Sequence, residues 1–178
     1  MTPEIQKRFE AVERQRHAIG ESALALSDAD LRWKPNADAW SVQQIVEHLV
    51  LSDETVGRAK NAGAVPSGAL MFRILPRALR RTLVLAAFQR NAVLPLPSPA
   101  IEPFGNVPLP GLLKRWNRSR AKLRRNLETM PPDERHYSHP VLGPLTAGQM
   151  LELARVHTSY HARQIKARRQ SMAKTGEL

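Results

Sequence analysis

Apolar residues in this chain recur at helical spacing, while the alternating runs typical of strands are almost absent. A first stripe begins after Thr2 and Pro3, which suit a helix start, and keeps a four-three spacing that only Arg16 interrupts. Its apolar members are Ile5, Phe9, Val12, Ile19, Ala23 and Leu26. Helices with one apolar face bury it against other helices, so we expect an all-α fold.

Three further helices are predicted, and two of them begin at capping boxes, in which a side chain at each end of a four-residue segment bonds the other's backbone N–H. The boxes are Ser41 with Gln44 and Thr146 with Gln149. The first of these helices should run to about Lys60 and the second to about Met172. An apolar seam predicts another helix over residues 111–130, which Pro131 ends. Residues 136–145, which contain Pro140 and Gly143-Pro144, are predicted to form a loop before the last helix.

The chain between the second and third helices is rich in proline, with eight of the fourteen prolines in residues 61–110. Two pieces are predicted as helical, 69–75 and 77–90, and residues 94–110 as an extended crossover. We interpret the whole stretch as an insertion within one domain, residues 1–178, because a separate domain of this size would lack a sufficient core. Four helices and one long crossover predict a four-helix bundle.

Two histidines lie four residues apart in the apolar seam of the fourth helix. At this spacing His157 and His161 project from one face, about 6 Å apart along the axis, so their imidazoles can bind one metal ion. The spacing also arises often by chance. Burying two imidazoles costs free energy unless each finds a partner, and one ion serves both. The alternative is core histidines bonded to carbonyls, or one histidine inside and one at the surface.

His48 extends the inner stripe of the second helix, so three inward histidines from two helices predict a metal site with open positions for water or substrate. An isolated core histidine is the alternative for His48. Candidates for contacts with ligands or substrate are Gln44, Ser52, Gln164 and His139. For each of these the alternative is ordinary helix surface or, for His139, a turn. Glu47 points about 100° away from His48 and is a poor general base.

Four stretches in the same regions carry a resemblance to a known family. They are Trp33-Lys34-Pro35 with Trp40-Ser41-Val42, residues 44–49, residues 139–146, and residues 157–165. Together they resemble the DinB/YfiT-like superfamily of bacterial four-helix-bundle metalloproteins. The resemblance implies an up-down-down-up bundle and a divalent metal, Zn or Ni, held by His48, His157 and His161. Characterised relatives include S-transferases and isomerases that use bacillithiol, mycothiol or similar thiols. Residues 61–110 are poorly covered.

The predicted function is therefore a metal-dependent, thiol-dependent S-transferase or hydrolase that acts on a small-molecule substrate. A metal on three neutral imidazoles keeps its +2 charge and lowers the pKa of a bound water or thiol. Because the chain has no cysteine, a low-molecular-weight thiol would have to be a cosubstrate. The alternative is a bundle that binds metal, or regulates, without catalysis.

The charge balance suggests acidic ligands without identifying them. Lys and Arg number 27 against 16 Asp and Glu, a net charge of +11. Basic residues in 115–125 could track phosphates, but aromatic residues are only 5%, too few to stack bases, so we expect no nucleic-acid partner. We see no secretory signal or transmembrane segment, which predicts a cytoplasmic protein. A homodimer through the insertion or a bundle face is compatible with the sequence. Residues 69–88 are apolar with interspersed arginines, and we favour a helical cover or a dimer surface over a membrane-binding role for them.

Overall fold

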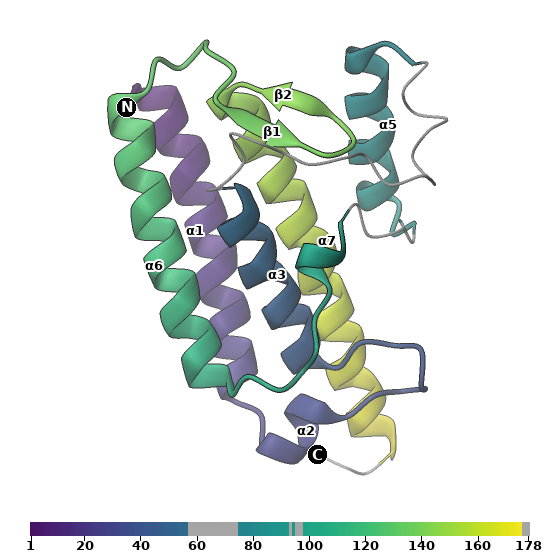
Figure 1. Ribbon diagram of the computed structural model, residues 1–178. Coiled ribbons are helices and arrows are strands. Elements are labelled where there is room, and N and C mark those ends of the chain that lie inside the picture. The colour runs from purple at the N-terminus through teal and green to yellow at the C-terminus, as the bar shows by residue number, and fades with distance from the viewer. Residues whose placement is uncertain (57–74, 93, 95–97, 176–178) are drawn as a thin grey trace.

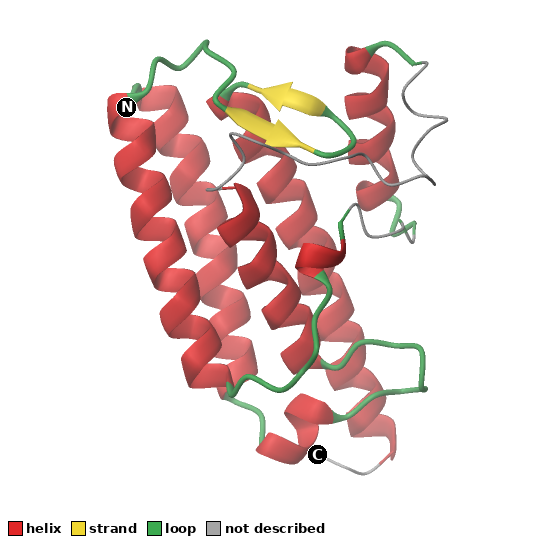
Figure 2. Cartoon of the chain, in the orientation of Figure 1, coloured by secondary structure: helices red, strands yellow, loops and turns green. Residues whose placement is uncertain are grey.

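The computed structural model describes residues 1–56, 75–92, 94 and 98–175, and most of these are helical (Figure 1, Figure 2). The helices are α1 (Pro3–Leu24), α2 (Asp28–Arg32), α3 (Val42–Val56), α5 (Arg77–Gln89), α6 (Leu109–Thr129) and α7 (Ala147–Thr175), with a 3-10 turn η3 (Pro99–Ile101). Two short strands are β1 (Tyr137–His139) and β2 (Gly143–Leu145). The predicted all-α class is confirmed to the extent that the described residues are mostly helical, with only one two-stranded sheet among them. No helix in the described ranges is both long and apolar enough to cross a membrane.

Both predicted capping boxes close as expected. The Gln44 backbone N–H donates to the Ser41 hydroxyl, and the Ser41 N–H donates to the Gln44 side-chain oxygen, each over 3.2 Å. At the start of α7, the Gln149 N–H donates to the Thr146 hydroxyl over 3.3 Å, with the reciprocal bond at 3.1 Å. These local bonds satisfy N–H groups that the first turn leaves without partners, which sets where α3 and α7 begin.

The four long helices α1, α3, α6 and α7 lie side by side, with α1 packed on α7 and α3 on α6 (Figure 1). Their apolar faces form two separate clusters. One gathers residues such as Ala23, Ile45, Leu112, Trp116 and Ile165. The other gathers residues such as Phe9, Leu127, Leu145, Met150 and Leu151. Buried polar side chains interrupt these apolar faces. Arg16 on α1, Arg120 on α6 and His161 on α7 lie between residues of the two clusters, whereas His48 on α3 lies among residues of the first cluster.

The segment before α7 departs from the sequence prediction. Residues 136–145 were expected to be a loop, but β1 and β2 pair antiparallel, with Tyr137 opposite Leu145 and His139 opposite Gly143. Gly143 takes a φ of +75°, a conformation that favours glycine, in this tight turn. Tyr137 and Leu145 are both buried in the second apolar cluster. Packing against the helices therefore stabilises strands too short to show an alternating pattern.

The described parts of the crossover pack on the long helices, α5 on α7 and η3 on α3. The predicted helix 77–90 is confirmed as α5, and the stretch expected to be extended contains η3, which packs on α3. The predicted helix over 69–75 and the expected end of the second helix at about Lys60 lie outside the described residues, apart from residue 75. Both α5 and η3 bring residues of the crossover to the histidine cluster.

Candidate metal centre

Helices α3 and α7 bring the three predicted histidines together. One ring nitrogen from each of His48, His157 and His161 lies within 4.8 Å of the other two. His157 is in the middle, with its Nε2 at 3.1 Å from His48 Nε2 and 3.0 Å from His161 Nε2. His48 and His161 are each only 3% exposed, and His157 is partly exposed.

The hydrogen-bond partners on the far side of two rings determine where their protons lie. His48 Nδ1 is 2.8 Å from the carbonyl oxygen of Ile101, which can only accept, so this Nδ1 carries the hydrogen. His161 Nδ1 is likewise 2.8 Å from the side-chain oxygen of Gln164, as the amide is assigned. In neutral rings, the Nε2 atoms of His48 and His161 then both present lone pairs toward His157.

Because His157 lies between the other two rings, hydrogen bonds among the three histidines cannot satisfy all of their Nε2 atoms. A neutral His157 has one N–H at most to offer at Nε2, and that hydrogen can satisfy only one of the two facing lone pairs. At least one close nitrogen pair is therefore left without a hydrogen between its atoms. A cation that accepts all three lone pairs would satisfy every nitrogen at once, and three imidazoles match the donor set that Zn²⁺ and similar ions prefer.

The electrostatics keep these rings in the form that binds metal. Burial, with a smaller contribution from His48, lowers the pKa of His161 to about 3. Burial and then repulsion from the neighbouring histidines lower the His157 pKa well below its usual value, and burial also lowers the pKa of His48. All three rings are neutral near pH 7, so no proton has to leave before an ion binds.

A cavity of about 390 Å³ adjoins the histidines, a suitable size for a small ligand. Much of its wall is apolar, including Phe88, Leu94, Ile101, Leu145, Met150, Leu153 and Ala154. Aromatic rings surround the cluster: the Trp40 ring centroid is 4.9 Å from that of His48, and the Phe88 centroid is 5.1 Å from that of His157. A ligand here would be shielded from much of the surrounding water.

Three of the four candidate contact residues reach this cavity. Gln164 lines it and holds His161. Ser52 lines it, and its buried hydroxyl oxygen has no hydrogen-bond partner among the described residues. His139 lines it while also stabilising a turn, because its Nδ1 accepts from the N–H groups of residues 141 and 142, each over 3.2 Å. Burial lowers the pKa of His139 to about 4.

The structure places Gln44 and Glu47 elsewhere. Gln44 is not among the residues that line the cavity, and its side chain closes the cap of α3 instead. Glu47 is buried and accepts a 2.6 Å hydrogen bond from the Gly105 N–H, in agreement with the prediction that it points away from His48. Neither side chain makes a hydrogen bond to any of the three histidines, all of which the structure describes.

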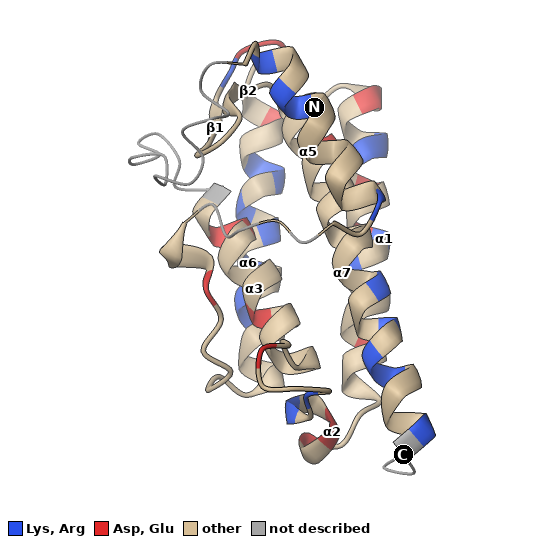
Figure 3. Ribbon diagram, turned by 90° about the vertical axis from the view of Figure 1, so that its right-hand side faces the viewer, with Lys and Arg blue, Asp and Glu red and all other residues tan. Residues whose placement is uncertain are grey.

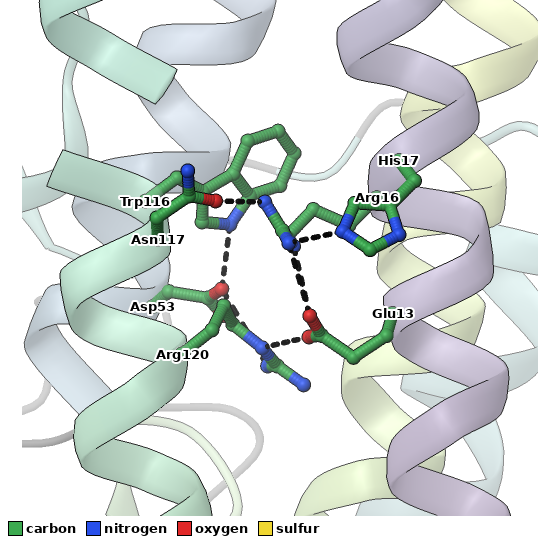
Figure 4. Close-up of polar contacts among 7 residues, drawn as sticks. All are labelled: Glu13, Arg16, His17, Asp53, Trp116, Asn117 and Arg120. Carbon is green, nitrogen blue, oxygen red and sulfur yellow. Dashed lines mark hydrogen bonds and ion pairs between the residues drawn. The ribbon is translucent and has the colours of Figure 1, made fainter. Parts of the chain in front are cut away.

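A second buried polar group joins α1, α3 and α6 (Figure 4). We call it the charged cluster: Glu13, Arg16, Asp53 and Arg120. Glu13 accepts from Arg120 Nε over 2.6 Å and pairs with Arg16 over 3.0 Å, and Asp53 lies 3.5 Å from Arg120 Nη1. Asp53 also accepts a 2.7 Å bond from the Trp116 indole N–H. Burial raises the pKa of Asp53, although Arg120 and Trp116 oppose this.

Arg16 therefore does not break the apolar seam of α1. It is only 7% exposed, and Asn117 accepts a further 2.7 Å bond from it. The sequence shows an arginine at a core position. One of its compensating partners, Glu13, lies on its own helix, but the other, Asn117, lies on α6, and no local pattern in the sequence links α6 to this position. A buried arginine is tolerated because it is paired.

Sequence reasoning missed several residues at the cavity. Arg168 follows His161 by seven residues, about two helical turns, so helical spacing alone could have placed it on the same face. Tyr137 lines the cavity with a buried hydroxyl that has no partner among the described residues, and Phe88 comes from the insertion. Neither carried a local signal, because the hairpin and α5 reach the cavity only through tertiary packing.

Comparison with known protein families matches residues 11–165 to the DinB superfamily. The matched range contains all three histidines, the hairpin and the insertion. Searches among curated proteins and among solved structures found no match.

Proposed function

Because the chain belongs to the DinB superfamily, we propose that it is a divalent-metal-dependent enzyme acting on a small molecule. His48, His157 and His161 would hold the ion. The observation that carries this proposal is the convergence of three neutral imidazole nitrogens, two of which have their hydrogens fixed on the far side of the ring. Zn or Ni is the proposed ion, since imidazole suits both.

The surrounding groups support this donor set. The Ile101 carbonyl and the Gln164 side chain each accept from a histidine Nδ1–H, which orients the ring and favours the tautomer that binds through Nε2. Three protein ligands leave positions for water or substrate. When bound, the metal would supply a lowered pKa to a water or thiol at such a position.

The chain's other residues would bind and shield the substrate. Phe88 and Trp40 pack against the histidine rings and exclude water. The hydroxyls of Ser52 and Tyr137 offer hydrogen bonds from the cavity wall. The chain has no cysteine, so a thiol-dependent reaction requires a low-molecular-weight thiol as cosubstrate. We therefore propose a thiol-dependent S-transferase or a hydrolase.

A second candidate is a bundle that binds metal without catalysis. The observation that favours it concerns two carboxylates near the histidines in sequence: Glu47 is bonded to Gly105, and Asp53 to Trp116 and Arg120. Neither is free to act as a general base. Nucleic-acid binding is a weaker candidate, because Arg115 and Arg120 are paired with acids of other helices.

We also propose that the four long helices form the up-down-down-up bundle implied by the family resemblance, within one domain of residues 1–178. The contacts of α1 with α7 and of α3 with α6 support this arrangement. A homodimer and a cytoplasmic location stay predictions.

The proposed function is tested in two stages. Untagged protein is purified without added metal, and its metal content is compared with that of His48→Ala and His17→Ala, the latter an exposed histidine outside the cluster. We expect about one ion per chain in wild type and His17→Ala and less than a tenth of that in His48→Ala. Loaded protein is then assayed with electrophiles and several thiols. Bound metal with no turnover of any of these substrates would favour the non-catalytic candidate.

A further inference from the structure

Among the described residues that line the cavity, Arg168 is the only lysine or arginine. It lies on α7 seven residues after His161, which places the two Cα atoms about 10 Å apart along the helix axis and on the same face. The side chain is partly buried. In the described part of the chain the cavity therefore has a single permanent cation, close to the histidine cluster but separate from it.

Trp40 connects Arg168 to the histidines. Arg168 Nε donates a 3.0 Å hydrogen bond to the Trp40 carbonyl, while the Trp40 ring centroid lies 4.9 Å from that of His48 and 6.3 Å from that of His161. One residue thus packs on two of the histidines and anchors the guanidinium. The two Nη groups of Arg168 make no hydrogen bond or ion pair with any residue in the described ranges, and such a free fork suits a carboxylate.

The other charges at the cavity do not neutralise this cation. Asp53 is already bonded to Trp116 and paired with Arg120 in the charged cluster. Asp38 lines the cavity but is exposed to solvent and makes no ion pair with Arg168. The three histidines are neutral near pH 7. Lysines and arginines also recur along α7, where they add to the positive potential (Figure 3).

The remainder of the wall suits an uncharged body. Leu145, Met150 and Leu153 line the cavity together with Phe88 and Ile101. An anionic group among these side chains would lose its hydration without gaining a partner. An acidic group of a bound molecule is therefore directed to Arg168, and its apolar part to this wall.

We propose that Arg168 binds the carboxylate of the small molecule whose reacting group lies at the three-histidine centre, so that the ligand class is a small organic acid with an apolar body. This inference rests on the metal centre proposed above. It makes Arg168 a specificity-determining residue, since it touches the ligand away from the reacting atoms.

The test uses cobalt-loaded full-length protein and matched pairs of thiols. Each pair is an ω-mercaptoalkanoic acid and its primary amide, with three to six methylene groups, and binding is followed by the near-ultraviolet absorption of the cobalt–thiolate bond. Arg168→Gln is compared with Lys166→Gln, which removes the same charge from an exposed position of α7 outside the cavity. Thermal unfolding checks that both variants are folded.

In wild type and Lys166→Gln we expect the acid of at least one length to bind about tenfold more tightly than its amide, as for a hydrogen bond to a charged group. In Arg168→Gln the acid should bind no better than the amide, with the amide's affinity within about twofold of wild type, and Arg168→Lys should restore part of the preference. Equal binding of acid and amide by cobalt-loaded wild type, or a preference that survives in Arg168→Gln, would overturn this inference about Arg168 and leave the proposed metal centre standing. Wild-type protein that binds no cobalt would overturn the proposed centre as well.

Discussion

The charged cluster, on α1, α3 and α6, and the histidine cluster, on α3 and α7, are both largely buried polar groups, yet their charges and hydrogen bonds are balanced in opposite ways. The charged cluster contains two acids and two arginines, and these side chains bond or ion-pair with one another. The histidine cluster contains three like groups whose lone pairs face each other. Burial of polar groups costs free energy unless they are paired. The charges of the first cluster are balanced within the chain, whereas a cation would be needed to satisfy all the lone pairs of the second.

This difference separates a structural role from a binding role. Removing one member of the charged cluster deprives its largely buried partners of a compensating charge, so the effect should be on folding. Removing one histidine relieves a conflict between lone pairs, so the effect should be on metal binding. Mutations in the two clusters should therefore change different measured quantities.

The largest expected effect on folding comes from the charged cluster. Arg120→Met removes a guanidinium that is 2% exposed and leaves Glu13 and Asp53 without their shared partner. We expect the free energy of unfolding to fall by about 3–5 kcal/mol, the usual cost of breaking a buried ion pair. The measurement is chemical denaturation of the metal-free protein.

The matched control is Arg118→Met, the same substitution at an exposed position of α6. It should change the free energy of unfolding by less than about 0.5 kcal/mol. A similarly small change in Arg120→Met would mean that the ion pairs of the charged cluster do not stabilise the fold.

The next effect uses pH to test the neutrality of the cavity's histidines. Burial lowers the pKa of His139 to about 4, while the unfolded chain has the ordinary value near 6.5. Above pH 6.5 the ring is neutral in both states. As the pH falls toward 4, the unfolded state takes up a proton that the folded state does not, so the free energy of unfolding falls, by up to about 3 kcal/mol.

The variant His139→Asn isolates this contribution, since an asparagine oxygen can accept the same turn N–H groups. We expect the stability of wild type, relative to the variant, to fall between pH 6.5 and pH 4. Parallel stability curves for the two proteins across this range would show that His139 is not held neutral by the fold.

The smallest effect concerns the orientation of one ring. Gln164→Ala removes the oxygen that accepts from His161 Nδ1–H, while leaving the three imidazoles in place. We expect zinc affinity to fall about 10–100-fold, the usual cost of losing such a partner. Competition with a chromophoric chelator measures the affinity, and Gln170→Ala, exposed on the same helix, serves as control. Unchanged affinity in Gln164→Ala would remove Gln164 from the centre.

The features predicted from sequence are those with local causes. The capping boxes depend on residues three apart, and the pairing of His157 with His161 depends on one helical turn. Phe88 and Ile101 could not be placed, because the insertion reaches the histidines only through packing of α5 and η3. Tyr137 belongs to a hairpin stabilised by its burial against the helices. The burial of Arg16 depends in part on Asn117, a residue of another helix.

The central claim is that three imidazoles from two helices bind one divalent ion, and metal content of purified protein tests it most directly. We predict about one ion per chain in wild type and less than a tenth of that in His157→Ala, with the free energy of unfolding of the metal-free form nearly unchanged. Full metal content in His157→Ala, or none in wild type supplied with zinc and nickel, would contradict the account.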